Sequence, residues 1–280
     1  MESFKKVGKN LNLNVTNLII GKNVSIGDNV NINCDTFEIG DNSIIGSNVT
    51  ISCKSFKSDE WLFMWDGVEV GRGGSYGPNS EVTIGKHVGI FENTIINPSD
   101  KVTIGDNVGI GSEVMIWTHG AWLDVMQGFP SDFGPVSIGK NVWLPARSIV
   151  LPNVEIGDNT VIGIGSIINK NIPAGSLAAG TPCKVLKENI YPKQLSFEEK
   201  NNILTNIVGD YTTLLKYKKL DAKVYLKDGN IVLDRLKGIT IFNPMAKTIN
   251  GVEDNISEDL RDYLRRRGIK IFTSNPFKSI

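Results

Sequence analysis

The sequence contains two histidines, and one of them, His119, stands where a regular six-residue pattern stops. The stretch VTIGDNVGIGSEVMIW keeps Ile104, Ile110 and Ile116 six residues apart, and the chain then continues as THG into a segment without the pattern. An imidazole changes its protonation state near neutral pH, so it can take a proton from a hydroxyl group that attacks an electrophile. His119 is therefore the first candidate for a general base; a corner histidine that bonds a nearby carbonyl group is the alternative.

The other histidine and the three cysteines argue against a metal site. His87 takes the place of asparagine in the hexad IGKHVG, so we expect it to be a structural corner residue. Two histidines cannot supply a zinc site made of three histidine ligands, and the cysteine spacing suits neither a zinc motif nor a disulfide framework. We expect no metal and free thiols, with Cys34 and Cys53 stacked in successive turns of the repeat.

The six-residue period decides the architecture. The sequence divides into triplets of hexads, and the first hexad of each triplet begins with Ile-Gly, at residues 20, 39, 84, 104, 138 and 156. A branched apolar residue at every sixth position does not match the stripe of a helix, but it suits short strands joined by tight corners. Gly and Asn, which recur in the corners, tolerate a positive φ. We predict a mainly β fold, a parallel β-helix of about six 18-residue coils stacked about 4.8 Å apart.

Two long insertions interrupt the repeat, at residues 57–83 and 121–137. Both follow a third hexad, so we expect them to leave the solenoid at the same corner, two coils apart. A long excursion from a rigid scaffold is a typical place for a ligand site, and His119 lies directly before the second one. The first insertion contains two tryptophans, Phe63 and Tyr76, which we expect to pack against a neighbouring subunit and to line the site.

Beyond the repeat, the chain changes character. Residues 1–183 carry 12 Lys and Arg against 18 Asp and Glu, whereas residues 184–280 carry 18 against 12. From about residue 187 the hexads give way to a helical pattern at 195–217, with Ser196 as its N-cap, and then to a hairpin around Asp228-Gly229 and a strand, helix and strand. We predict a β-helix domain at 1–188 and a small α+β domain at 189–280 that caps the open end of the solenoid.

Composition also excludes some partners. No stretch combines basic and aromatic residues as a nucleic-acid surface does, and RDYLRRRG at 261–268 reads as one solvated helix face. No apolar run approaches the roughly 20 residues of a membrane span. The opening MESFKKVGKN leads into no signal-peptide core. We expect no nucleic-acid partner, no integral membrane segment and a cytoplasmic location.

The stretch NVWLPARSIVLPNVEIGDNTVIGIGSIINKNIPAGSLAAGTPCKVLKE, at 141–188, resembles the C-terminal signature of the hexapeptide-repeat acyltransferases. The match is to the branch that holds maltose, galactoside and polysaccharide O-acetyltransferases, and the resemblance covers about residues 20–188. It implies a left-handed β-helix, although parallel crossovers are generally right-handed. It also implies acetyl-CoA as the acyl donor and a sugar or polysaccharide as the acceptor. Because two loops leave one corner and can each reach an adjacent solenoid, we expect a homotrimer with active sites between subunits.

The resemblance implies roles for individual residues. His119 follows the IGDNV coil where the family has its catalytic histidine. Asn93, in FENTIINP, lies eleven residues before Ile104, at the offset of a family asparagine that helps to place the acceptor and the reacting groups. Asp124 and Asp132 are loop carboxylates that could orient His119.

The resemblance also indicates where acetyl-CoA binds. Trp143 matches the family tryptophan that lines the active-site tunnel. The family continues Trp-Ile-Gly-Ser, whereas this chain has Trp-Leu-Pro-Ala, so at Ala146 the serine hydroxyl is absent and only a backbone N–H remains to face an oxyanion. Backbone groups of the following coils would hold the pantetheine arm and basic side chains would meet the phosphates; the candidates are Gly163, Ile164, Asn169, Lys170, Lys184 and Lys187.

The sequence therefore predicts an acetyl-CoA-dependent enzyme that acetylates a hydroxyl group of a sugar or surface-polysaccharide precursor. An amino-sugar N-acetyltransferase is the alternative on the same solenoid. Many of those enzymes place a nucleotide-sugar-binding domain before the helix, and only about 19 residues precede this repeat. A non-catalytic solenoid for assembly is the third possibility, and the presence of His119, Asn93 and the acyl-CoA signature favours an enzyme over it.

Overall fold

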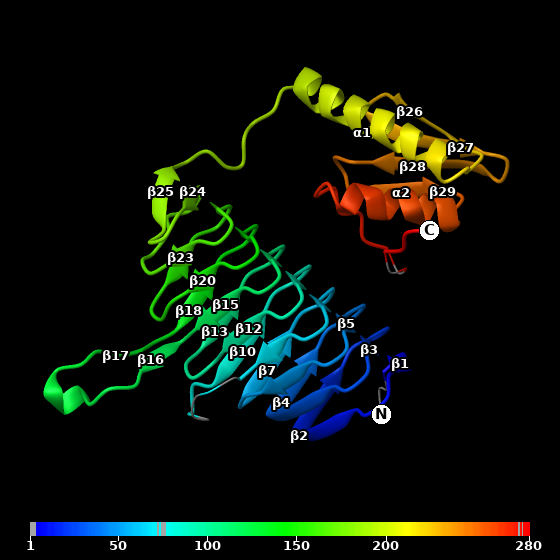
Figure 1. Cartoon of the computed structure of the whole chain (residues 1–280). Helices are drawn as coiled ribbons and strands as arrows, with labels where there is room; N and C mark the ends of the chain where they lie inside the picture. The colour runs from blue at the N-terminus through cyan, green and yellow to red at the C-terminus, as the bar shows by residue number, and fades with distance from the viewer. Residues whose placement is uncertain (1–3, 72, 74–76, 274, 276) are drawn as a thin grey trace. The chain divides into compact units, whose positions relative to one another are not determined.

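The computed structural model describes residues 4–71, 73, 77–273, 275 and 277–280. It divides into two compact units, Met1–Lys193 and Gln194–Ile280, which are drawn together in Figure 1 and are treated separately below.

The first unit is a parallel β-solenoid (Figure 1). One face is a sheet in which nine parallel strands stack in register: β1 (Lys6–Val7), β3 (Ser25–Ile26), β5 (Ile44–Ile45), β8 (Phe63–Met64), β11 (Gly89–Ile90), β14 (Gly109–Ile110), β19 (Trp143–Leu144), β22 (Val161–Ile162) and β24 (Leu177–Ala179). Nine stacked strands mean about nine coils, so the predicted fold class is confirmed but the predicted number of about six is too low.

The other two faces form one continuous sheet because early strands run unbroken around a corner. β4 (Asn31–Ile39) pairs with β2 (Asn12–Ile20) on one side and with both β6 (Thr50–Ser52) and β7 (Ser55–Ser58) on the other. The face that begins with β6 continues through β9 (Glu69–Val70), β12 (Ile95–Asn97), β15 (Met115–Trp117), β20 (Ile149–Val150) and β23 (Ile167–Ile168). The face that begins with β7 continues through β10 (Glu81–Ile84), β13 (Val102–Ile104), β18 (Val136–Ile138) and β21 (Glu155–Ile156).

Corners and core follow the periodicity of the sequence. Asparagine side chains at one corner bond from coil to coil, for example from Asn107 to Asn141 at 2.9 Å and from Asn141 to Asn159 at 2.9 Å. His87 occupies this same column with a φ of 61°, which confirms that it is a corner residue. The inward residues of every coil, such as Ile104, are buried in one continuous apolar core.

The first predicted insertion is mostly regular coil. Residues 57–70 contain β8 and β9 with left-handed corners at Trp61 and Gly67, so this part of the predicted insertion belongs to the solenoid. Neither corner carries the Gly-Asp-Asn pattern, and for that reason this coil was missed. Strands β1 and β24 supply the other two unpredicted coils.

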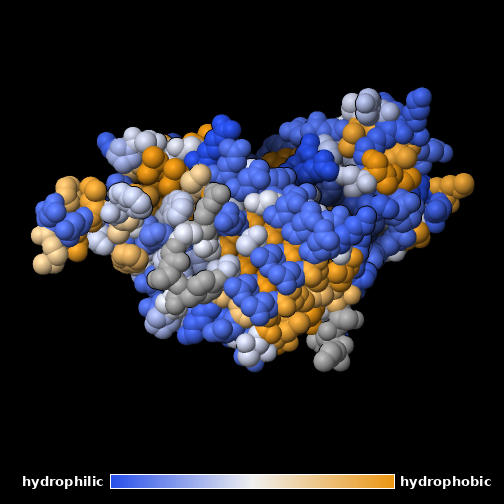
Figure 2. Space-filling view, turned by 60° about the horizontal axis from the view of Figure 1, so that its bottom comes forward, coloured by the Kyte–Doolittle hydropathy of each residue, from blue (hydrophilic) through white to orange (hydrophobic). Residues whose placement is uncertain are grey.

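The second insertion is a projecting antiparallel hairpin. It is built from β16 (His119–Ala121), the 3₁₀ helix η1 (Val125–Gln127) and β17 (Ser131–Phe133), and its far end extends away from the solenoid (Figure 1). Trp122 and Met126 near its tip are 95% and 89% exposed, and Figure 2 shows hydrophobic residues on this arm. The predicted insertion, 121–137, runs two residues too far because Val136 already belongs to β18.

The edge of the nine-stranded face is closed within the first unit. β25 (Lys184–Lys187) pairs antiparallel with β24, the last parallel strand. The backbone that the second domain was predicted to cap therefore already has a partner on this face.

The second unit consists of a four-stranded antiparallel sheet and two helices. Its elements are α1 (Phe197–Tyr217), β26 (Lys223–Lys227), β27 (Asn230–Arg235), β28 (Gly238–Asn243), β29 (Thr248–Gly251) and α2 (Asn255–Arg265). Ser196 caps α1 in a capping box, and the hairpin turns at Asp228 and Gly229, as predicted.

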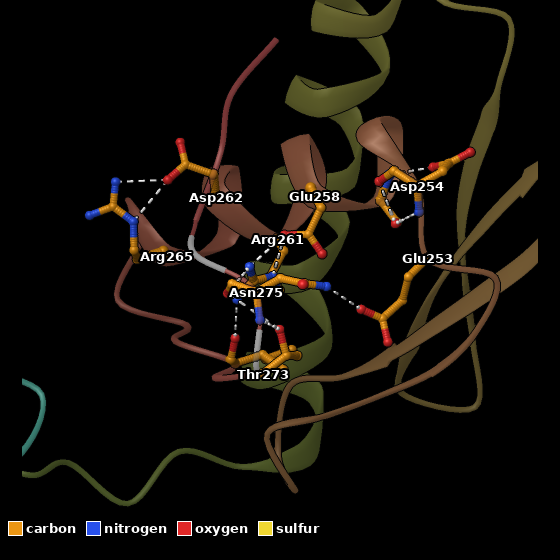
Figure 3. Close-up of polar contacts among 10 residues, drawn as sticks. Glu253, Asp254, Glu258, Arg261, Asp262, Arg265, Thr273 and Asn275 are labelled. Carbon is orange, nitrogen blue, oxygen red and sulfur yellow. Dashed lines mark hydrogen bonds and ion pairs between the residues drawn. The ribbon is translucent and has the colours of Figure 1, made fainter. Parts of the chain in front are cut away.

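The predicted strand at 269–274 is wrong over its described residues, which form no strand. Arg261, which is fully buried, donates instead to the carbonyl oxygens of Ile271 and Asn275, and its guanidinium lies over the Phe277 ring. Figure 3 shows Arg261 and Asn275 of this network, together with the contact from Asn275 to Glu253. The end of the chain is thus tied to a buried side chain rather than to a sheet ladder.

Candidate active site

His119 lies at the corner where the arm leaves the solenoid. It begins β16, and its side chain turns toward the preceding coil, where Asn97 ends β12. Nδ1 of His119 is 2.8 Å from Oδ1 of Asn97 and 3.0 Å from Oγ of Ser99. These two residues, 22 and 20 positions earlier in the chain, are the hydrogen-bonding partners of the imidazole.

This arrangement selects one tautomer of the ring. Oδ1 of Asn97 accepts from the backbone N–H of Ser99 at 3.3 Å and from its hydroxyl at 3.1 Å. An amide oxygen cannot donate, so Nδ1 of His119 must carry the hydrogen that it shares with Oδ1. The proton-free lone pair is then on Nε2, which is the state that a general base requires.

Asn97 is itself held firmly. Its side chain is 1% exposed, and its Nδ2 donates to the backbone oxygen of Gly73 in the first insertion. Its own backbone oxygen accepts from the hydroxyl of Thr118 at 2.7 Å, and Thr118 in turn accepts from the backbone N–H of Asp100 at 2.9 Å. The side-chain amide of Asn97, at the end of β12, therefore bonds both to the first insertion and to His119 at the start of the arm.

Aromatic rings limit how the imidazole can rotate. Phe133 of β17 pairs with His119 across the arm and stacks on its ring, with centroids 5.8 Å apart and an interplanar angle of 25°. Trp117 meets the same ring edge-on at 5.9 Å. Phe133 and Trp117 together therefore restrict the orientation of the His119 ring.

The predicted orienting carboxylates do not serve His119. Asp124 caps η1 at the far end of the arm, where its side chain accepts from the backbone N–H of Met126 at 2.9 Å. Asp132 lies opposite Gly120 and is exposed. The missed residues, Asn97 and Ser99, stand in the stretch NPSDK at the corner between β12 and β13, and this polar break in the hexad pattern is the signal that could have found them.

Asn93 lies at the other end of β12 from Asn97. It is an exposed corner residue with a φ of 57°, in the column that also holds Asn29 and Asn48. Its side-chain oxygen sits directly against Gly67, where a Cβ atom would be 2.4 Å away. Within one chain, Asn93 and His119 therefore occupy different corners, and the role of Asn93 stays a prediction.

Trp143 lies on the nine-stranded face, again away from the His119 corner. Its side chain is 42% exposed, and its ring rests on Gly109, where a Cβ atom would come within 2.6 Å of the ring. A glycine is needed at this position for the tryptophan to lie flat. Ala146 follows at the next corner, where a Cβ atom on Gly111 would lie 2.4 Å from its backbone nitrogen.

The remaining cofactor candidates continue toward the end of the solenoid. Gly163 and Ile164 form the corner above Ala146, and Ile164 is 75% exposed. The backbone N–H of Gly165 donates to the Ala146 oxygen at 3.1 Å. Four other candidates have exposed side chains, two just after β23 and two in β25: Asn169, Lys170, Lys184 and Lys187.

Apart from the four exposed candidates after β23 and in β25, the predicted residues of a single chain fall into two groups. One contains His119 and its newly found partners at the arm corner. The other runs along the nine-stranded face and its adjoining corner, from Trp143 to Ile164.

In the part of the chain that the structure describes, no cluster of three or more His, Cys, Asp or Glu side chains could hold a metal ion. Within the same residues, neither helix combines the length and apolar character that a membrane crossing demands.

Two stretches of the solenoid match models of repeat families. Residues 135–170 match the model described as bacterial transferase hexapeptide (six repeats), and residues 17–53 match the hexapeptide repeat of succinyl-transferase. The chain is a hexapeptide-repeat protein. Both matched stretches carry Ile-Gly hexads whose first residues point into the core.

This hexapeptide-repeat protein is similar to acetyltransferases over part of its length. It is 52% identical over 54 residues to the galactoside O-acetyltransferase of Escherichia coli strain K12, which covers 19% of this chain and 27% of the relative. It is 39% identical over 96 residues to a putative acetyltransferase of Saccharomyces cerevisiae, which covers 33% of this chain and 44% of the relative. The chain thus spans less than half of the length of these relatives.

Two solved acetyltransferase structures also align with part of this chain. A maltose O-acetyltransferase from Clostridium difficile 630 aligns at 26% identity with a TM-score of 0.35, covering 61% of this chain and 68% of the other. The polySia-specific acetyltransferase NeuO aligns at 20% identity with a TM-score of 0.49, covering 76% and 98%.

Proposed function

We propose that this protein transfers an acetyl group from acetyl-CoA to a hydroxyl group of a sugar or surface-polysaccharide precursor, with His119 as the general base. The observation that carries the proposal is the 2.8 Å contact between Nδ1 of His119 and Oδ1 of Asn97, which leaves Nε2 free to accept a proton. The similarity to a galactoside O-acetyltransferase supports the reaction class.

The chemistry follows from this tautomer. As the acceptor hydroxyl attacks the thioester carbonyl carbon, its proton passes to Nε2 of His119, and the carbonyl oxygen becomes an oxyanion. The intermediate collapses when the carbon–sulfur bond breaks, and the imidazolium returns the proton to the departing CoA sulfur. Oδ1 of Asn97 keeps the ring oriented throughout, because it accepts the Nδ1 hydrogen both before and after the proton transfer.

We propose further that the working enzyme is a homotrimer. The His119 corner of one chain would face the Trp143 face of its neighbour, because these two groups lie on different parts of one solenoid. The thioester would then lie along Trp143, Ala146 and Ile164 of one subunit while His119 of the other removes the proton. The exposed apolar tip of the arm, with Trp122 and Met126, is suited to pack against that neighbour.

The decisive test is the replacement His119→Ala, measured by CoA thiol release with acetyl-CoA and a panel of galactosides, maltose and amino sugars. Loss of the base should lower the transfer rate by roughly 10² to 10⁴. Affinity for acetyl-CoA should stay the same, because the donor residues lie elsewhere. His87→Ala, at a corner of an earlier coil, is the matched control and should keep the rate within a few-fold.

A folded His119→Ala variant that acetylates a hydroxyl acceptor at the wild-type rate would refute the assignment. Activity only with amino sugars, and insensitive to His119, would favour the N-acetyltransferase alternative.

A further inference from the structure

The thiols of Cys34 and Cys53 form a close pair inside the solenoid. Cys34 and Cys53 follow directly after Asn33 and Ser52, which pair in register on β4 and β6. Their sulfur atoms are 3.8 Å apart, and the residues are 6% and 0% exposed. The stacking expected from their positions in the repeat is therefore confirmed.

The backbone geometry permits a covalent bond between the two residues. In-register neighbours on adjacent parallel strands lie about 4.8 Å apart, within the Cα separation of about 4.4 to 6.8 Å that disulfides span. The two sulfur atoms already face each other across a single contact, so closing the bond requires movement of the side chains rather than of the coils.

A cavity adjoins the pair, and Cys34 is the one of the two residues that has any exposed surface. The cavity has a volume of about 630 Å³ and is lined by both cysteines together with the polar side chains of Asn14, Thr16, Asp35 and Lys54. Lys54, which follows Cys53, donates to the backbone oxygen of Pro78 at 2.9 Å and so ties the first insertion to this corner. A thiol that lines such a hollow can meet a water-sized reagent although its residue is largely buried.

The two sulfur atoms are not equivalent. The hydrogen bond between the two thiols lowers the pKa of Cys34, and burial opposes this only in part. The same bond, together with burial, raises the pKa of Cys53. Cys34 is also the more exposed of the two residues, at 6% against 0%, so we assign it as the sulfur that a small reagent meets first.

We propose that Cys34 and Cys53 form a peroxide-reactive dithiol site, independent of acetyl transfer, which hydrogen peroxide converts into an intramolecular disulfide. Cys34 is the sulfur that attacks, and Cys53 is the resolving thiol. The site is formed by the register of two coils and by the cavity beside them.

The reaction proceeds in two balanced steps. The Cys34 sulfur attacks one peroxide oxygen, so that a sulfur–oxygen bond forms, the oxygen–oxygen bond breaks and one water molecule leaves; Cys34 is oxidised to a sulfenic acid and the peroxide is reduced. The Cys53 sulfur then attacks Cys34, so that the disulfide forms, the sulfur–oxygen bond breaks and a second water leaves with the Cys53 proton. Overall, two thiols and one peroxide give one disulfide and two waters.

Cys183 provides an internal control. It is buried near the other end of the solenoid, its pKa is raised by burial, and its sulfur has the Ser166 hydroxyl rather than another thiol as neighbour. We expect it to react more slowly with peroxide than Cys34 by at least about tenfold, since reactivity follows the thiolate.

The experiment treats the full chain with one equivalent of hydrogen peroxide and then measures thiols in denaturant, intact mass and disulfide-linked peptides. The protein should lose two of its three thiols, lose the mass of two hydrogen atoms and recover both thiols with dithiothreitol. Cys183→Ser should behave in the same way. Cys53→Ser should accumulate a sulfenic acid on Cys34 that dimedone traps, whereas Cys34→Ser should react at least about tenfold more slowly.

Retention of all three thiols by the wild-type protein would overturn the proposal, as would oxidation of Cys183 before Cys34. Equal rates for the Cys34→Ser and Cys53→Ser variants would overturn the assigned roles. The wild-type peptide map decides the main question even where a variant does not fold.

Discussion

Asn97 offers the sharpest test of how His119 is prepared for catalysis. Replacing Asn97 by Asp keeps an oxygen for the Nδ1 hydrogen, now 2.8 Å away, but makes that oxygen negatively charged. A hydrogen bond to a charged group contributes about 1.5 to 3 kcal/mol, against about 1 kcal/mol for a neutral pair. The carboxylate should therefore favour the protonated ring by an additional ~1 to 2 kcal/mol.

This difference converts directly into a change of the pH profile. About 1.4 kcal/mol corresponds to one pH unit, so the rise of activity with pH should move upward by about one unit in Asn97→Asp. At high pH the rate should return to within a few-fold of wild type, because the same tautomer is selected. Asn97→Ala removes the acceptor and should lower the rate about five- to tenfold at every pH, the equivalent of one lost hydrogen bond.

The assay is the rate of CoA release at saturating acetyl-CoA across the pH range, for the wild type and both variants. Both variants lose the donor to the Gly73 oxygen, so the difference between them isolates the contribution of Oδ1. Asn159→Asp is the matched control, because Asn159 accepts from Asn141 at a corner of a later coil and should leave the profile unchanged. Identical pH profiles for the wild type and Asn97→Asp, with a full rate for Asn97→Ala, would refute this account of His119.

Three further predictions concern the donor face, the second unit and the assembly. Gly109→Ala would place a Cβ atom 2.6 Å from the Trp143 ring, so the ring must move. The affinity for acetyl-CoA, measured by calorimetry, should fall about tenfold while the fold is kept. Unchanged affinity would remove Trp143 from the donor site. Burial opposes ionisation of Asp262, but bonds from Ser279 and Arg265 outweigh it and lower its pKa. Its stabilising effect is thus present above the unfolded pKa of about 3.9 and lost as pH falls through the folded pKa. Asp262→Asn should therefore lower the free energy of unfolding of the second unit in urea by about 1 to 3 kcal/mol at pH ~7, and hardly at all below the folded pKa of Asp262. An equal loss at neutral and at acid pH would contradict this. Sedimentation or native mass measurement at micromolar concentration should show a trimer, and a monomer would count against a site shared between subunits.

Much of the scaffold could be predicted from the sequence because a solenoid is a repetitive structure. Each coil buries the same inward positions as its neighbour, so the spacing alone predicts that Ile104 and Ile138 are buried. Corners with Gly-Asp-Asn were equally predictable, since few residues adopt a positive φ. The coil at 57–70 escaped because its corners use Trp61 and Gly67, and its regularity lies in backbone register rather than in residue type.

The candidate site could be predicted only in part. The break in the repeat identified His119, because a histidine that ends a regular coil is visible in a linear sequence. Its partners were not visible: Asn97 and Ser99 reach it only because one coil advances the chain by about twenty residues and returns it to the same corner. Whether the chain comes back to the same corner depends on how many residues lie between successive corners of the coil.

The sequence by itself determined the repeat, the inward residues, the corner positions and the candidate base. Only the tertiary structure decided that the described residues form about nine coils, that Asn97 rather than Asp124 holds the imidazole, and that His119 lies at the arm corner, away from the nine-stranded face that carries Trp143. The physical reason is that periodic burial is a local property of the chain, whereas contacts between coils depend on how many residues each turn consumes and on which way each side chain points at its corner.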